Sequence, residues 1–221
     1  MRAKIFLSLA FILCLLTTSC MKQKSSVSPE HKILEGQEKL VGFTPLLKDG
    51  NFYVYKNSNE RSFFAPSGWM GDYGDIKMDY SCKDNPYSEP TCLRFEYSAK
   101  KTQQQGWAGV YWQNPANNWG DKKGGYNLTG AKRLTFYARG EKGGEIIAEF
   151  KVGGIFQGEY PDSSSNSIGP IVLTKHWKKY TIELKGLDLS YINGGFCWVA
   201  TANDNPEGCI FYLDDIQYEF Q

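Results

Sequence analysis

The sequence contains little histidine, and this scarcity limits the chemistry that the chain can perform. Only His31 and His176 occur among 221 residues. A zinc site built on cysteine would need closer cysteine spacing or histidine ligands, and neither histidine lies near a cysteine in the sequence. A hydrolase triad would depend on His176, and the sequence has no Gly-x-Ser-x-Gly motif. The sequence therefore gives little support to zinc chemistry or to nucleophilic hydrolysis.

Charge of either sign is not in excess, and long apolar runs are few. The chain has 25 Lys and Arg residues against 24 Asp and Glu residues, and it has no basic stripe. Proteins that bind nucleic acid rely on Lys and Arg to neutralise phosphates, so we expect no nucleic-acid partner. Beyond residue 20 no apolar run is long enough to cross a bilayer.

Residues 1–20 have the features of an export leader. Arg2 and Lys4 precede an apolar run, Ile5 to Leu16, that is too short to span a bilayer comfortably. The run ends in Leu-Thr-Thr-Ser-Cys20, which resembles the leader of bacterial lipoproteins. The resemblance implies cleavage before Cys20, lipidation of its thiolate, and a lipid-anchored protein of the bacterial cell envelope. The alternative is an ordinary secretory signal with an incidental cysteine.

The start of the mature chain adds further expectations. In the lipoprotein resemblance, Met21 in place of an acidic residue implies the outer membrane. Residues 21–45, which begin with a stretch rich in Ser, Lys and Gln, are predicted to form a solvated tether. Residues 46–221 then form one domain, an ordinary size for a single all-β sandwich. We expect this domain to be a monomer.

Export predicts an oxidising compartment, and the cysteine count agrees with it. Once Cys14 and Cys20 are set aside with the leader and the lipid, an even number remains: Cys82, Cys92, Cys197 and Cys209. Three pairings are possible. We favour Cys82–Cys92 and Cys197–Cys209, because each pair brackets a short loop with Pro and Asp. Closing a loop of this size stabilises a fold by about 3 kcal/mol.

Short segments rich in Val, Ile, Tyr, Phe and Trp recur between clusters of Gly, Asn, Asp and Pro, a pattern typical of antiparallel strands. The predicted strands are Asn51–Tyr55, Cys92–Ser98, Ala108–Gln113, Arg133–Arg139, Ile146–Val152, Lys179–Leu184, Phe196–Ala200 and Ile210–Phe220.

Several of these segments alternate with period two, so one face packs and the other meets solvent. Leu93, Phe95 and Tyr97 oppose Arg94, Glu96 and Ser98; Leu134, Phe136 and Ala138 oppose Arg133, Thr135, Tyr137 and Arg139; Ile146, Ala148, Phe150 and Val152 oppose Glu145, Ile147, Glu149 and Lys151. Two such sheets stacked face to face would bury the apolar sets. The sequence therefore predicts an all-β, antiparallel, two-sheet sandwich.

The densest aromatic stretch runs from Trp107 to Trp119. It places three tryptophans and Tyr111 beside Gln and Asn side chains, which both donate and accept hydrogen bonds. A sugar ring has apolar C–H faces and a rim of hydroxyls, and this mixture complements both. The alternative is a strand whose aromatics serve the core. That alternative is weakest for Trp119, which lies among turn residues.

Several motifs, in order, resemble the galactose-binding-like β-jelly rolls, which include many bacterial carbohydrate-binding modules. They are Leu134-Thr-Phe-Tyr-Ala-Arg139, Trp177-Lys-Lys-Tyr180, Phe196-Cys-Trp198 and Phe211-Tyr-Leu-Asp-Asp-Ile216. The resemblance covers roughly Phe63 to Glu219 and implies a jelly roll that binds sugar. The site is implied either at the loops of one edge or on a concave sheet face. The first carries over to Trp69, Tyr73, Trp107, Trp112 and Trp119; the second carries over to Tyr111, Gln113, Tyr137, Arg139 and Glu149.

Many of these jelly rolls hold a structural calcium ion, so the resemblance also implies candidate ligands. They are Asp72, Asp75 and Asp79 early in the domain, and Asp214 or Asp215 on the last strand. Calcium takes six to eight oxygens, so backbone carbonyls would have to complete the shell. Turn carboxylates that cap loops are the alternative.

Three classes of function follow from these observations. The first is a non-catalytic lipoprotein that captures poly- or oligosaccharide by aromatic stacking and hydrogen bonds. The second is a structural or assembly lipoprotein whose aromatics contact a protein partner. The third is a glycoside hydrolase or lyase, whose two carboxyl groups would be Glu96 and Glu149, both predicted on polar strand faces. We favour the first.

Overall fold

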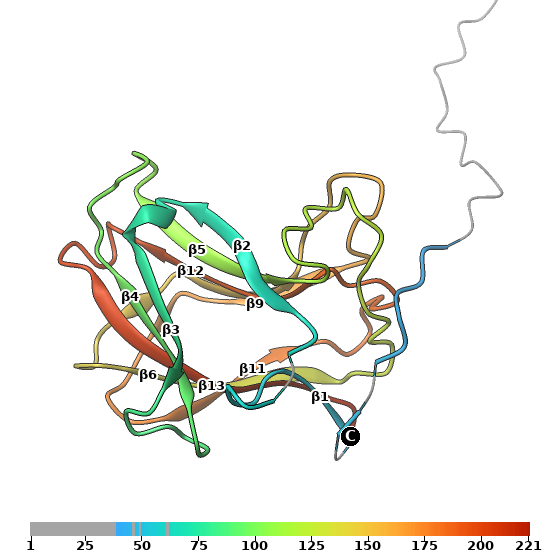
Figure 1. The fold of residues 1–221 in the computed structure, drawn as a ribbon, viewed down its shortest axis with the longest axis horizontal. Coiled ribbons are helices and arrows are strands. Elements are labelled where there is room, and N and C mark those ends of the chain that lie inside the picture. The colour runs from blue at the N-terminus through green and yellow to red at the C-terminus, as the bar shows by residue number, and fades with distance from the viewer. Residues whose placement is uncertain (1–38, 46, 49, 61) are drawn as a thin grey trace, which may run out of the picture. The chain divides into compact units, whose positions relative to one another are not determined.

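The apolar segments form strands in two stacked antiparallel sheets (Figure 1). The computed structural model describes residues 39–221 except 46, 49 and 61. The predicted leader, Cys20 and most of the tether lie outside these residues. Residues before 46, the predicted start of the domain, already bind to the sandwich: Gly42 N donates to Ser190 O and Phe43 N donates to Gly125 O.

One sheet has six strands around β13 (Cys209–Glu219), the longest strand of the described residues. Its order is β11 (Lys178–Glu183), β6 (Arg133–Gly140), β13, β4 (Cys92–Tyr97) and β3 (Ile76–Cys82), with β1 (Asn51–Tyr55) also paired to β13. Partly buried Glu219 ties three strands of this sheet together. Its carboxylate accepts hydrogen bonds from Arg133 at 2.5 Å, Thr135 at 2.7 Å and Lys179 at 2.9 Å. Burial opposes ionisation, but Lys179, Thr135 and Arg133 outweigh it and lower the pKa of Glu219 to about 2.

The other sheet has five strands and carries the candidate site. Its order is β2 (Ala65–Gly71), β5 (Trp107–Gln113), β12 (Gly194–Thr201), β8 (Glu149–Gly153) and β9 (Ser165–Ile168). A short pair, β7 (Ile146–Ile147) and β10 (Ile171–Val172), stands beside it, and one 3-10 turn, η1 (Tyr73–Asp75), links β2 to β3. The pairing of edge strand β2 with β5 is bulged between Pro66 and Gly68.

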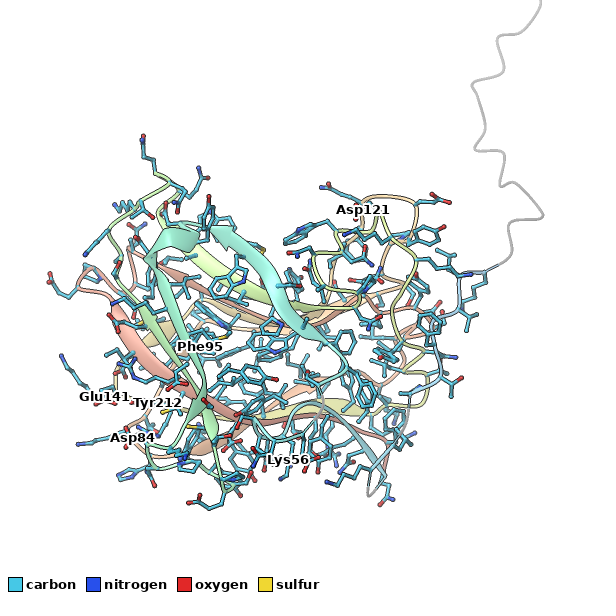
Figure 2. The ribbon with its side chains drawn as sticks, viewed as in Figure 1. Lys56, Asp84, Phe95, Asp121, Glu141 and Tyr212 are labelled. Atoms are coloured by element: carbon cyan, nitrogen blue, oxygen red, sulfur yellow. The ribbon has the colours of Figure 1, made fainter. Side chains whose placement is uncertain are left out.

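The core lies between the sheets and is rich in aromatic rings. Phe95 of β4 packs against Trp112 of β5 and Trp198 of β12, with ring centroids 6.0 and 5.0 Å apart. Figure 2 shows Phe95 in the interior of the sandwich. Phe136 of β6 contacts Phe196 of β12 at 5.2 Å. These contacts confirm the predicted all-β sandwich and the faces predicted for residues 93–97 and 133–139, whose apolar members are buried.

The prediction for residues 145–152 is wrong in its first half. The structure has two strands here, and Ile147 is fully buried while Ile146 is partly exposed. Ala148 lies between the strands and donates its N–H to Val199 O. This one-residue interruption reverses the alternation, so only Phe150 and Val152 face the core as predicted.

The predicted pairing of Cys197 with Cys209 is wrong. The four cysteines of the described residues are free thiols. Cys197 lies on the outer side of β12 against Tyr111 and Ile155, whereas Cys209 belongs to the core between the sheets. Cys82 and Cys92, the other predicted pair, are cross-strand neighbours in β3 and β4, but no disulfide joins them. In the described part of the chain, no helix is long and apolar enough to cross a membrane.

Candidate functional site

The outward-facing surface of the five-stranded sheet, here called the outer face, is flanked by loops at both ends. Figure 1 shows these loops rising beyond β2 and β5, residues 98–106 at one end and residues 114–126 with 154–164 at the other. Alternation along β5 places Trp107, Gly109 and Tyr111 on this face, because Ala108, Val110 and Trp112 are in the core. The outer face therefore lies between these two groups of loops.

Trp119 lies at one end of the outer face with 42% of its surface exposed. Its ring meets the ring of Tyr111 edge to face, with centroids 6.0 Å apart and an interplanar angle of 86°. Tyr111 is itself buried, and its hydroxyl donates to Gly153 O at 2.7 Å. Burial is the main reason that the pKa of Tyr111 is raised. Tyr111 thus supports the ring of Trp119 and does not meet solvent.

Buried Asn118 fixes the loop that presents Trp119. Its amide nitrogen donates to Asn114 O, Lys122 O and Asn193 Oδ1 at 2.8–3.1 Å. Its amide oxygen accepts from the N–H groups of Gly120 and Lys122 at 3.0 and 3.1 Å. The indole of Trp119 is consequently held on a rigid turn before any ligand arrives.

A second exposed ring, Phe156, lies on the neighbouring loop with 59% of its surface exposed. The two loops pack backbone to backbone, since a Cβ on Gly158 would lie 2.2 Å from Gly120 O. Buried Asp162 closes the second loop by accepting the N–H groups of Ile155, Asn193 and Gly194. Burial outweighs these donors and raises the pKa of Asp162 to about 6.

Polar groups of the outer face come mainly from β8. Glu149 and Lys151 form an ion pair at 3.3 Å, and both side chains are about one-third exposed. Beside them lies a small apolar cluster of Tyr111, Ile155 and Cys197, against which Met70 and Val199 pack. Partly exposed Trp107 lies at the opposite end of β5 from Trp119. Tyr111 lies four positions further along the strand, a distance of roughly 13 Å.

The two edge-loop candidates from β2 and η1 lie elsewhere. Trp69 is 36% exposed and pairs with Val110, a core residue, so it is on the opposite side of β2 from Met70. Tyr73 is 54% exposed on η1, at the end of the sandwich far from Trp119.

The prediction that Trp112 stacks on a sugar is wrong, because its side chain is fully buried between the sheets. Gln113 is fully buried too, with its amide bonded to Ser67 Oγ and Asn118 O. Tyr111 is only 6% exposed. These residues shape or support the outer face without presenting a surface to a ligand.

The predicted concave set is also divided between two sheets. Tyr137 and Arg139 belong to β6 of the six-stranded sheet, whereas Tyr111, Gln113 and Glu149 belong to the five-stranded sheet. Arg139 is buried over the ring of Tyr212, at 3.6 Å from its centroid, and Tyr137 stacks on Tyr87. Figure 2 shows Tyr212, Asp84 and Glu141 on the far side of Phe95 from Asp121, which belongs to the Trp119 loop.

The two carboxylates of the predicted catalytic pair, Glu96 and Glu149, also belong to different sheets. Glu96 lies on β4 with Lys77 at 3.2 Å and Arg94 at 3.6 Å, whereas Glu149 lies on β8. Both carboxylates point outward, from different sheets, with the core between them. They do not flank a common space where a glycosidic bond could lie.

The predicted calcium ligands do not gather into one site. Asp72 is fully buried, and its carboxylate accepts the N–H groups of Gln103, Gln105 and Gly106. Burial opposes ionisation of Asp72, but these donors outweigh it and lower its pKa. Asp75 follows it on η1, and Asp79 is exposed on β3.

The two aspartates of the last strand have partners of their own. Asp214 accepts the N–H of Ser88 and Asp215 accepts Lys56 Nζ, at 3.0 and 2.8 Å. Within residues 39–221 as described, no three Asp, Glu, His or Cys side chains are grouped so that they could hold a metal ion. The aspartates cap loops and pair with lysine instead.

Sequence reasoning missed Phe156 and Asp162, and it counted Asn118 among the polar groups suited to a sugar without predicting that its side chain is buried. Phe156 follows the pair Gly153-Gly154, whose positive φ angles of 61° and 101° turn the chain away from β8. An aromatic residue just after such a turn was the available signal. Asn118 and Asp162 resemble any turn residue in sequence, and only the fold shows that they are buried.

Comparison with known proteins adds evidence on the fold. No family model matches the sequence, and no curated protein matches it. A crystal structure of a family 30 carbohydrate-binding module superposes with a TM-score of 0.53 at 14% identity, covering 77% of this chain and 99% of that one. A second family 30 structure gives 0.50 at 15%, covering 77% and 88%. The family 30 module of a cellulosomal cellulase of Clostridium thermocellum gives 0.48 at 14%, covering 76% and 96%. The first two superpositions show that the chain has the β-sandwich fold of carbohydrate-binding modules.

Proposed function

We propose that this protein is a non-catalytic glycan-binding protein whose site is the outer face of the five-stranded sheet. The observation that carries the proposal is Trp119, an exposed indole held on a rigid loop above that face. Phe156 on the adjoining loop and Trp107 at the far end of β5 extend the aromatic surface. Glu149 and Lys151 between them supply hydrogen-bonding groups.

The shape of the outer face favours a chain of sugars over a single ring. The polar residues of β8 lie between the raised loops, and the aromatic rings lie near the two ends. Stacking with a few hydrogen bonds is expected to give Kd values from about micromolar to millimolar, or about −4 to −8 kcal/mol. The fold shared with carbohydrate-binding modules supports the same class of ligand.

The test is binding of the purified protein to a panel of soluble polysaccharides, by affinity gel electrophoresis and then by calorimetry. A buried tryptophan occupies 150–250 Å², so the 42% exposed fraction of Trp119 offers roughly 60–105 Å² to a ligand. At about 25 cal/mol per Å², Trp119→Ala should cost about 1.5–2.5 kcal/mol, a loss of roughly 10- to 70-fold in affinity.

The matched control is Trp69→Ala, which removes a similarly exposed indole from the other side of β2. We expect this variant to bind like the unaltered protein. Equal binding by Trp119→Ala and the unaltered protein, or equal losses in both variants, would count against the site. Capture of a stoichiometric protein partner, with no glycan bound, would favour an assembly role instead.

Absence of catalysis is part of the proposal, and it is supported by the separation of Glu96 from Glu149. The measurement is the release of new reducing ends from each polysaccharide that binds. If Glu149→Gln abolished such release while leaving binding intact, the protein would be an enzyme.

We also propose lipid attachment at Cys20, which rests on the sequence pattern alone. Labelling with a fatty-acid analogue in a bacterial host should mark the unaltered protein. Cys20→Ser should remove the label and move the protein from the outer-membrane fraction to a soluble fraction. A label that persists in Cys20→Ser would contradict the assignment.

A further inference from the structure

A cavity of about 750 Å³ lies at the opposite end of the sandwich from Trp119. Its walls are the β2–β3 turn, the facing ends of β3 and β4, and the loops 141–145 and 204–208. Glu141, which Figure 2 labels at this end, is one of its lining residues. The volume suits a small organic molecule.

Three buried polar atoms of residues that line this cavity have no hydrogen-bond partner among the described residues. They are Asp75 Oδ1, Tyr97 OH and Glu145 Oε2. The three residues are only 3%, 1% and 9% exposed. Buried polar atoms without a partner are rare in folded proteins, and here three of them lie in the walls of one cavity.

The fold fixes each carboxylate by one oxygen and leaves the other without a donor. Asp75 Oδ2 accepts the N–H of Lys101 at 2.7 Å, and Glu145 Oε1 accepts the N–H of Lys142 at 2.7 Å. Glu145 can occupy its position only because residue 140 is glycine: a Cβ there would lie 1.7 Å from Glu145 Oε2. The carboxylates are therefore positioned by the backbone.

The cavity has an anionic character. Burial first, and then the charges of Asp75 and Asp72, raise the pKa of Tyr97 to about 12. Burial first, and then the charge of Glu145, raise the pKa of Cys209 to about 12. Acidic lining residues outnumber basic ones; they are Asp75, Glu96, Glu141, Glu145, Asp204 and Glu207 against Lys77, Lys100 and Lys142.

These features distinguish between classes of ligand. A bare metal ion does not fit, because no three acidic, Cys or His side chains of the described residues are grouped to hold one. An anion is disfavoured by the charge. A primary ammonium carries only donors and a positive charge, so it complements a cavity whose charged lining residues are mainly carboxylates. We propose that this cavity binds a small molecule carrying protonated primary amines, either an amino sugar or a linear polyamine.

The experiment titrates the purified full-length protein with glucosamine oligomers in one arm and with spermidine in the other. N-acetylglucosamine oligomers, which lack the charge, are the ligand control. Glu145→Gln should weaken binding of the amine by about tenfold or more. Gly140→Ala should weaken it similarly while every acidic residue is kept. Glu183→Gln makes the same charge change at an exposed position on β11 and should leave binding unaltered.

Melting temperatures and amide spectra accompany each titration. Ligand-induced shifts should map to Gly143, Gly144 and Gly208, which line the cavity, and Trp119→Ala should not affect them. Binding of only one of the two ligands shows whether the cavity takes an amino sugar or a polyamine. Binding of both supports recognition of the primary ammonium group itself. Failure of both amines to bind at millimolar concentration, equal binding of the N-acetylated oligomers, or equal affinity in Glu145→Gln and Glu183→Gln with both variants folded would overturn the proposal.

Discussion

Replacing Asn118 by alanine tests whether the Trp119 loop is rigid by construction. The side chain is fully buried and makes five hydrogen-bond contacts, three from its nitrogen and two to its oxygen. A net value of about 1 kcal/mol for each would give about 5 kcal/mol. Two amide hydrogens cannot fully satisfy three acceptors, so we expect the free energy of unfolding to fall by about 3–4 kcal/mol.

Urea unfolding followed by tryptophan fluorescence measures this loss, with exposed Lys123→Ala in the same loop as the control. Asn118→Asp should be at least as harmful at neutral pH, because a carboxylate oxygen would then face the carbonyls of Asn114 and Lys122. Glycan affinity should fall in both variants although Trp119 is retained. A loss of stability below about 1 kcal/mol with unaltered affinity would refute the view that this side chain builds the loop.

Three further predictions concern the stability of the protein and the loop of residues 103–106. Trp112→Ala should destabilise the protein by about 3–5 kcal/mol in the same urea assay, because it empties the core, whereas Trp119→Ala should change stability by less than about 1 kcal/mol. Glu219 has a folded pKa of about 2 against an ordinary 4.5, so its stabilising effect is complete above about pH 4.5 and is lost as pH falls to about 2. Glu219→Gln should therefore reduce stability at pH 7 by about 1–3 kcal/mol and flatten the acid limb of a pH–stability curve, and an unchanged limb would contradict the assignment. Asp72→Asn removes one of the two acceptor oxygens that bind the N–H groups of Gln103, Gln105 and Gly106. These backbone amides should then exchange hydrogen faster. Unaltered exchange would show that the carboxylate does not order this loop.

The fold was predictable from the sequence where period-two patterning is strong. Phe95 and Phe136 were placed on the correct faces because alternation needs no knowledge of the partner strand. The same argument failed at Ile146 and Ile147, because the strand is interrupted at Ala148 and no residue type in this segment indicates the interruption. Strand β2 was missed because Pro66 and Gly68 disguise it as a loop.

The site was predictable only in part, for a topological reason. Alternation could separate Trp112 from Tyr111, but it could not say which of the two faces is inside. It also could not reveal that Tyr137 and Glu149, although on segments close in sequence, belong to different sheets. Membership of a sheet depends on long-range pairing, which a single sequence does not display. Trp119 stood apart because turn residues surround it, and turns lie at the surface.

The bulged edge strand β2 hinders strand-to-strand association between copies of this protein. A sheet margin with free backbone donors and acceptors invites a neighbouring molecule to add a strand. Pro66 contributes no N–H, and the bulge before Gly68 breaks the regular spacing that an incoming strand would need. Exposed Lys178 places a positive charge along another margin, β11. Two copies that met at β2 would consequently form few of the backbone hydrogen bonds that a continuous intermolecular sheet needs.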